Sequence, residues 1–289
     1  MPRSNSPLRY PGGKSSIYDL VDGFIRANNL EHSDYVEPYA GGCGLALSLL
    51  FANRVADIHI NDLDPAIWSF WTCVLNHTQE LTTLIEKTPV TLSEWRKQKE
   101  IHEAHDTSNT LALGFATFFL NRTNRSGIIK GAGIIGGFEQ QGKYLMDCRY
   151  NKADLIRRIK RISSYKSRIN LYNLDAVEFM SRASKLVPDE SFFCIDPPYY
   201  KKGSALYTNF YTPEQHAEVA DHVLALKQPW IVTYDKTPEI LSLYKSRRRF
   251  GFNINYSLQT KKVGNEILIA SKGLRLPRDQ AQKLEKLSA

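Results

Sequence analysis

The residues best suited to chemistry are Asp196-Pro197-Pro198-Tyr199, which directly follow the apolar run Phe192–Ile195. Four apolar residues in a row are typical of a short strand that is buried on both faces. Proline lacks an N–H and fixes φ, so the strand must end at this point. The pattern therefore places a carboxylate, backbone carbonyls and an aromatic ring at the carboxyl end of a strand, where open α/β sheets bind ligands. From these residues alone, a proline-rich turn without a site is an equally good interpretation.

Three more expected strands end in an acidic residue. These acids are Glu37 after Asp34–Val36, Asp62 after Ala56–Asn61, and Asp175 after Arg168–Leu174. A glycine-rich turn over Pro38–Gly44 leads into the apolar helix Leu45–Phe51, as in the first βα unit of a nucleotide-binding fold. An acid about 20 residues beyond such a turn is the expected partner of ribose hydroxyls, and Asp62 fits this spacing. Glu37 would repel a pyrophosphate but accepts hydrogen bonds from amines or hydroxyls, which favours a cationic or uncharged ligand over NAD.

The amino-terminal segment contains Gly13-Lys14-Ser15, which imitates the end of a phosphate-binding P-loop. That motif needs a glycine where Leu8 stands and a strand before it, and neither is present. An NTPase is therefore disfavoured. What remains is a tight Pro-Gly-Gly turn with a lysine beside it, followed by an amphipathic helix over about Ile17–Ile25.

From about residue 77 to 150 the alternation of strands and helices breaks down. Helices are expected near Leu92–His105 and Thr107–Leu120, followed by the polar turn Asn121–Gly127. Two Ile-Ile pairs around a Gly-Ala-Gly predict a β-hairpin over Ile128–Phe138. Arginine suits guanine and phosphate and asparagine suits adenine, so this stretch is a candidate for contact with a nucleic-acid groove. A flexible surface loop is the alternative interpretation.

Composition narrows the class of protein. The chain has 289 residues, a formal net charge of +8 and a pI near 9.2, which favour a polyanionic partner, nucleic acid first. The four cysteines stand far apart, which disfavours a zinc ribbon or disulfide framework and suits a reducing cytosol. No signal peptide opens the sequence and no apolar run approaches a membrane span. We therefore expect no membrane partner and a location in the cytoplasm or on the bacterial nucleoid.

Taken in order, these blocks resemble the D12-class, Dam-like DNA adenine-N6 methyltransferases over nearly the whole chain. Tyr10-Pro11-Gly12-Gly13-Lys14 is similar to the family's amino-terminal cofactor motif. Glu37–Gly44 is similar to its glycine motif, with Cys43 where glycine is commoner. Asn61-Asp62 matches the ribose-binding acid, and Asp196-Pro197-Pro198-Tyr199 matches the catalytic tetrad.

The resemblance implies an α/β fold with a Rossmann-like S-adenosylmethionine-dependent methyltransferase sheet, formed by residues 1–76 and 151–289. Residues 77–150 would be an inserted, mostly helical target-recognition domain containing the β-hairpin. The implied reaction moves a methyl group from S-adenosyl-L-methionine to N6 of adenine in double-stranded DNA by base flipping, with no metal. We expect the protein to act as a monomer.

The resemblance also implies roles for single residues. On the flipped base, Asp196 and the Pro197 carbonyl would accept hydrogen bonds from the exocyclic amine while Tyr199 stacks, with Pro198 completing the tetrad. The implied cofactor contacts are Tyr10, Pro11, Gly12, Lys14, Glu37, Pro38, Gly41, Gly44, Asp62, Asp175 and Asp196. The candidate DNA contacts are Asn121, Arg122, Asn124, Arg125 and Lys130.

Two alternatives stay open. A cytosine-N4 methyltransferase also methylates an exocyclic amine, but that class usually has serine at the first tetrad position, so Asp196 favours adenine. A non-catalytic DNA-binding relative would keep the fold without the chemistry. The complete tetrad and the complete set of strand-end acids argue against such decay.

Overall fold

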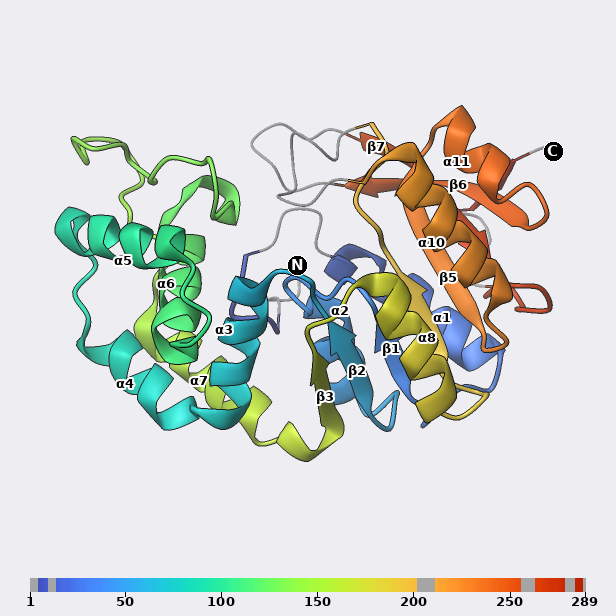
Figure 1. Ribbon diagram of the computed structural model, residues 1–289, viewed down its shortest axis with the longest axis horizontal. Helices are drawn as coiled ribbons and strands as arrows, with labels where there is room; N and C mark the ends of the chain where they lie inside the picture. The colour runs from blue at the N-terminus through green and yellow to red at the C-terminus, as the bar shows by residue number, and fades with distance from the viewer. Residues whose placement is uncertain (1–4, 10–13, 202–210, 256–262, 279–283, 288–289) are drawn as a thin grey trace. The chain divides into compact units, whose positions relative to one another are not determined.

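The computed structural model describes residues 5–9, 14–201, 211–255, 263–278 and 284–287 (Figure 1). The chain divides into two compact units. The helical unit comprises Met1–Gly13, Gly41–Gly44 and Asp62–Asn173, and the sheet unit comprises Lys14–Ala40, Leu45–Asn61 and Leu174–Ala289. The helical unit includes all of residues 77–150; the boundaries of a recognition domain stay a prediction.

The sheet unit is built on one mixed sheet with the strand order β2-β1-β4-β5-β7-β6-β8. The strands are β1 (Tyr35–Glu37), β2 (Ile58–Asn61), β4 (Phe192–Ile195), β5 (Trp230–Asp235), β6 (Arg248–Asn255), β7 (Val263–Ala270) and β8 (Glu285–Lys286). Neighbours from β2 to β5 run parallel, whereas β7 runs antiparallel to both β5 and β6. The α/β fold that the sequence predicted is confirmed in this sheet.

The register of these strands gathers acids at one edge. The parallel strands β1, β4 and β5 have their carboxyl ends at this edge. Glu37 and Asp235 are the last residues of β1 and β5, and Asp196 directly follows β4. Because β7 is antiparallel to β5, a residue near the start of β7 lies at this same edge. This residue is Glu266, which pairs with Asp235. The whole of β4 is buried, as its run of four apolar residues predicted.

Helices alternate with the strands of the sheet unit along the sequence. They are η1 (Lys14–Ile17), α1 (Tyr18–Ala27), α2 (Gly44–Phe51), α8 (Ala176–Leu186), α10 (Pro213–Ala225) and α11 (Pro238–Leu243). Helices α8 and α10 pack side by side (Figure 1). Thr212 caps α10 through its side chain, and the Gln215 side chain accepts a bond from the Thr212 N–H, which forms a capping box.

The helical unit contains α3 (Pro65–Asn76), α4 (Thr78–Lys87), α5 (Leu92–Ala104), α6 (Thr110–Thr123), η2 (Arg125–Gly127), α7 (Lys152–Ser163), η3 (Lys166–Arg168) and β3 (Ile169–Tyr172). Helix α6 packs against α3 and α5. A Cβ at Gly114 of α6 would lie 2.7 Å from the Ser69 carbonyl oxygen of α3, so glycine permits this close crossing. No described helix is both long and apolar enough to span a membrane.

The predicted β-hairpin over residues 128–138 is corrected by the structure. No residue of this segment, all of it described, lies in a strand, and Ile134 forms an isolated antiparallel bridge with Asn124, which precedes the segment. Gly131, Gly136 and Gly137 have φ of +79°, +83° and +71°. Left-handed backbone at these positions turns the chain away from the extended conformation that a hairpin ladder needs.

Candidate active site

Asp196, the first residue after β4, is held by two partners. Its Oδ1 lies 2.8 Å from Lys14 Nζ and accepts a hydrogen bond of 2.7 Å from Thr233 Oγ1 of β5. Among the described residues, both of these contacts are made by Oδ1, so Oδ2 can accept further bonds. The Asp196 side chain is 17% exposed and that of Lys14 is 5% exposed. Asp196 is therefore an anchored acceptor that ligand can still reach.

Tyr199 is fixed on several sides although it lies in a loop. Its buried hydroxyl donates to Oε1 of Glu266, and Lys14 Nζ lies 5.9 Å from its ring centroid. The next two backbone N–H groups, of Tyr200 and Lys201, donate to the Asp235 carboxylate at 2.8 and 3.0 Å. Pro197 is buried and Pro198 half-buried between these anchors. The tetrad thus has a defined conformation, set by two acids of β5 and β7.

Buried carboxylates give this edge of the sheet a negative character. Glu37 and Glu266 are only 4% and 2% exposed. Burial raises the pKa of the Cys194 thiol to about 12, and the negative charge of Glu37 adds to the rise. Burial likewise raises the pKa of Glu266 to about 7, against the lowering effect of Lys14. A surplus of acceptors and negative charge suits a cationic ligand or an amine.

Asn61 orders the turns beside this edge. Its buried amide donates to the carbonyl oxygens of Pro38 and Leu174 at 3.1 and 3.0 Å, and its Oδ1 accepts from Leu174 N. Asp175 follows at once, is exposed, and caps α8 by accepting from Val177 N at 2.8 Å. Its predicted contact with the cofactor adenine stays a prediction.

In the helical unit, Asp62 is tied to the glycine turn. Its Oδ2 accepts from Gly41 N at 2.8 Å and its Oδ1 from Asp64 N at 2.9 Å. Burial raises the pKa of Asp62 to about 7, although both N–H groups oppose the rise. Cys43 has φ of +52°, in the left-handed region that favours glycine, so a glycine would fit this position of the turn without strain. Gly44 begins α2, and Tyr10, Pro11 and Gly12 lie outside the described residues.

The candidate DNA contacts fall into two groups. Asn121 and Asn124 are buried, and their amides shape the local chain. The Asn121 side chain bonds Arg9 N and Arg9 O at 2.7 and 2.8 Å, and that of Asn124 bonds the carbonyls of residues 128 and 129. Arg125 and Lys130 are exposed instead. Base contact stays a prediction for all of them.

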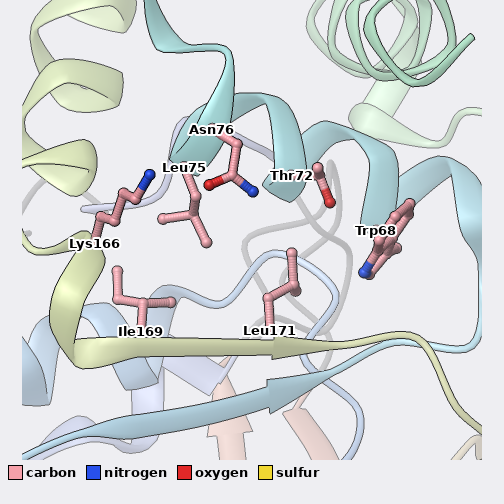
Figure 2. A pocket seen from close by; sticks show the side chains of 7 residues that line it. All are labelled: Trp68, Thr72, Leu75, Asn76, Lys166, Ile169 and Leu171. Carbon is pink, nitrogen blue, oxygen red and sulfur yellow. The ribbon is translucent and has the colours of Figure 1, made fainter.

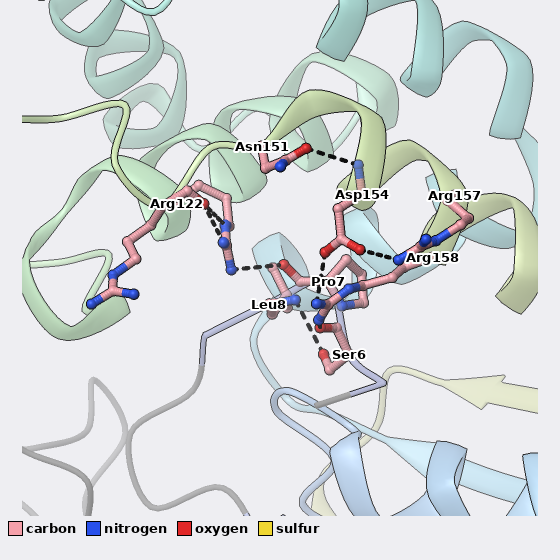
Figure 3. A network of polar contacts seen from close by, with 9 residues as sticks. Ser6, Pro7, Leu8, Arg122, Asn151, Asp154, Arg157 and Arg158 are labelled. Carbon is pink, nitrogen blue, oxygen red and sulfur yellow. Dashed lines mark hydrogen bonds and ion pairs between the residues drawn. The ribbon is translucent and has the colours of Figure 1, made fainter. Parts of the chain in front are cut away.

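Arg122 belongs to a cluster of guanidinium groups. It donates to the carbonyl oxygens of Arg149 and Pro7, while Arg158 donates to that of Ser6 (Figure 3). Burial lowers the pKa of Arg122 to about 9, and repulsion from Arg9, Arg158 and Arg149 adds to the effect. Asp154 balances part of this charge by pairing with Arg158 at 2.7 Å. The residual positive field suits phosphate.

Sequence reasoning missed several residues that the structure points to. In the sheet unit, Thr233 and Glu266 contact the tetrad directly, and Asp235 holds the two residues that follow it. In the helical unit, Phe138 and Tyr144 are 57% and 58% exposed beside the exposed Lys143. Aromatic residues within a glycine-rich polar stretch were the available signal for the last two.

A shallow hollow on the helical unit lies between α3, η3 and β3 (Figure 2). It is lined by Trp68, Thr72, Leu75, Asn76, Lys166, Ile169 and Leu171. None of the predicted site residues lines it, so it takes no part in the arrangement above. Within the described residues, no group of three or more His, Cys, Asp and Glu side chains could hold a metal ion.

Comparisons with known proteins supply the class of chemistry. The family model of the D12 class N6 adenine-specific DNA methyltransferases matches residues 10–262. No curated protein sequence matches the chain. Two solved structures are weakly similar to it. The rRNA methyltransferase AviRa from Streptomyces viridochromogenes has 12% identity and a TM-score of 0.34, covering 87% of this chain and 82% of its own. A Legionella pneumophila protein has 11% identity and a TM-score of 0.30, with 88% and 85% covered.

Proposed function

Because the chain belongs to the D12-class N6 adenine-specific DNA methyltransferases, we propose that it transfers a methyl group from S-adenosyl-L-methionine to N6 of adenine in double-stranded DNA. One observation supports the chemistry most: Asp196 is anchored through Oδ1 by Lys14 and Thr233, with Oδ2 left as an acceptor. An exocyclic amine presents two N–H donors, and an anchored carboxylate suits them.

The reaction requires the target adenine to leave the base stack, because N6 cannot reach a methyl donor inside a duplex. Asp196 Oδ2 and the Pro197 carbonyl oxygen would each accept a hydrogen bond from the N6 amine. These two bonds would orient the lone pair of the nitrogen. The Tyr199 ring would stack on the base. The lone pair would then form the new N–C bond as the S–C bond to the methyl group breaks, so that S-adenosylhomocysteine leaves and one N6 proton passes to solvent. Orientation of this kind is the main contribution of the protein.

The described residues fit the proposed cofactor. When bound, S-adenosylmethionine supplies a methyl group on a positively charged sulfur. The buried carboxylate of Glu37 at the end of β1 favours a positive group, whereas it would repel a pyrophosphate. We propose that Glu37, Pro38 and Lys14 hold the cofactor in the sheet unit. Asp62, with the Gly41–Gly44 turn, is proposed for the ribose, and Asp175 for the adenine.

DNA would be bound through the helical unit. Arg125 and Lys130 are exposed cations, and Arg149 adds an exposed charge to the arginine cluster. Phosphate contacts by such groups position a duplex without reading its sequence. The exposed rings of Phe138 and Tyr144 offer flat apolar surfaces to bases.

The identity of the methylated nucleoside tests this proposal. Purified protein is incubated with labelled S-adenosylmethionine and unmethylated double-stranded DNA, and the DNA is digested to nucleosides for mass spectrometry. We expect label in N6-methyldeoxyadenosine and much less with the same DNA as single strands. Label in N4-methyldeoxycytidine would support the cytosine-N4 alternative. DNA binding without any methylation would support the non-catalytic one.

A further inference from the structure

Glu266 on β7 has no place in the mechanism above, yet its carboxylate lies at the centre of the tetrad's contacts. It is 2% exposed. Oε1 accepts the Tyr199 hydroxyl bond, and Oε2 is 3.9 Å from Lys14 Nζ with no hydrogen-bond partner among the described residues. Lys14 in turn contacts Asp196. A buried carboxylate is costly unless it is paired, and the partners of Glu266 are Tyr199 and Lys14.

We propose that Glu266 is a positioning residue of the methyl-transfer site, which orients the Tyr199 ring through its hydroxyl and shares Lys14 with Asp196. The proposal rests on the function proposed above. The ring's place over the base is set by rotation about its side-chain torsions, and a bond at the far end of the ring fixes that rotation. Misplacement of a group that orients the substrate slows the chemical step more than it weakens binding.

The position of Glu266 in the sheet makes this role specific. Its antiparallel pairing with Asp235 joins two acids that hold consecutive parts of one loop. Asp235 binds the N–H groups of Tyr200 and Lys201, and Glu266 binds the side chain of Tyr199. The backbone and the ring are therefore fixed by different strands. Loss of Glu266 frees the ring while Asp235 still holds the main chain.

The charge of Glu266 depends on the groups that face it. These are Lys14 from η1, Asp196 and Tyr199 after β4, and Asp235 of β5. Burial raises the pKa of Glu266 to about 7, and Asp196 and Asp235 add to the rise. An ionised Glu266 can only accept from Tyr199 and attracts Lys14. Protonation removes the attraction, so we expect methyl transfer to decline as pH falls through about 7.

A double-mutant cycle tests the contact. The wild type, Glu266→Ala, Tyr199→Phe and the double variant are compared in single-turnover methyl transfer at pH 8 with saturating DNA. We expect Glu266→Ala to slow transfer about tenfold, the size of one hydrogen bond to a charged group. In the Tyr199→Phe background the same change should cost less than about threefold. If Glu266→Ala slowed methyl transfer by the same factor in the wild-type and Tyr199→Phe backgrounds, the proposal would be overturned.

The isosteric variant separates positioning from packing. Glu266→Gln keeps an acceptor for Tyr199 but no charge, so it should recover most of the Glu266→Ala loss at pH 8. It should also lose the decline in transfer rate between pH 8 and 6 that the wild type shows. Glu178→Gln, at an exposed acid of α8, is the control and should keep both the rate and the decline. A decline that persists in Glu266→Gln contradicts the proposal.

The same four proteins of the cycle are unfolded in urea, which needs no methyl transfer. Coupling between residues 199 and 266 in the unfolding free energy supports the contact whether or not the wild type is active. If the wild type shows this coupling but methylates nothing, only the proposed function fails. If Glu266→Ala does not fold, Glu266→Met, which keeps much of the volume and has no oxygen acceptor, completes the cycle with Tyr199→Phe. If the wild type is active, absence of coupling in turnover overturns the positioning role whatever the unfolding shows.

Discussion

At the scale of single residues, the chemistry depends on one buried lysine beside an aspartate. Lys14 Nζ contacts Asp196 Oδ1 at 2.8 Å, and both side chains are largely buried. Removing one partner of such a pair leaves the other charge uncompensated, which typically costs about 3–5 kcal/mol. Lys14 is therefore needed for the conformation of the tetrad as well as for its proposed contact with the cofactor.

We predict that Lys14→Met lowers the unfolding free energy by about 3 kcal/mol and slows methyl transfer by at least about tenfold. Methionine keeps much of the volume, so the effect reports the lost charge. Urea unfolding and single-turnover rates measure the two effects. Lys201→Met, at an exposed lysine after the tetrad, is the control and should change stability by less than about 0.5 kcal/mol. A Lys14→Met variant as stable and as fast as that control would contradict the assignment.

Asp62 predicts a pH effect with a definite sign. Burial raises its folded pKa to about 7 from 3.8, so the folded state binds more protons than the unfolded state between these values. Stability from this group is therefore present at low pH and is lost as pH rises toward 7. We predict that the unfolding free energy of Asp62→Asn, relative to wild type, increases between pH 5 and pH 8. If the difference in unfolding free energy between the two proteins stayed constant with pH, burial would not raise the pKa of Asp62.

At the scale of elements, the close crossing of α3 and α6 depends on a single glycine. A Cβ at Gly114 would meet Ser69 O at 2.7 Å and Cys73 Sγ at 2.8 Å. We predict that Gly114→Ala lowers the unfolding free energy by about 1–3 kcal/mol, because α6 must move away from α3. Thermal unfolding measures the change. Gly133→Ala is a matched control, since a Cβ there meets nothing within 4 Å, and an equal loss in both variants would refute the packing argument.

Elements whose signals are local could be predicted from the sequence. The strand Phe192–Ile195 and the helix after the glycine-rich turn were predicted from adjacent apolar residues, and β4 and α2 confirm them. The predicted hairpin over Ile128–Phe138 does not form, because glycines with left-handed backbone override the strand propensity of the Ile-Ile pairs. Helix α4 and strand β6 were also missed. Strand β6 begins in a basic run and is stabilised by pairing with β7, which a local pattern does not show.

The same limit applies to the candidate site. Asp196 and Lys14 were identified from motifs, and the structure brings them together. Thr233, Asp235 and Glu266 were not identified, because they reach the tetrad only through the pairing of β5 with β4 and β7. Sequence motifs located the residues proposed for the chemistry. The residues that hold them in place required the register of the sheet.

At the scale of the whole molecule, the net charge of +8 should appear as salt dependence. DNA binding by phosphate contacts weakens steeply with salt, and each contact contributes about 0.9 to the logarithmic slope. We predict that Arg149→Ala lowers this slope by about 1, since Arg149 is an exposed member of the arginine cluster. Arg182→Ala is the control, because Arg182 is paired with Glu178 within α8. Fluorescence anisotropy over a salt series measures both, and a slope unchanged by Arg149→Ala would remove that residue from the interface.

The central claim is that Asp196 is the acceptor for the adenine amine, and one measurement tests it most directly. Single-turnover transfer of labelled methyl groups to double-stranded DNA is compared for wild type and Asp196→Ala, with DNA binding measured on the same preparations. We predict that Asp196→Ala loses transfer by at least about a hundredfold and binds DNA within about threefold of wild type. Transfer at the wild-type rate by a folded, DNA-binding Asp196→Ala protein would contradict the account.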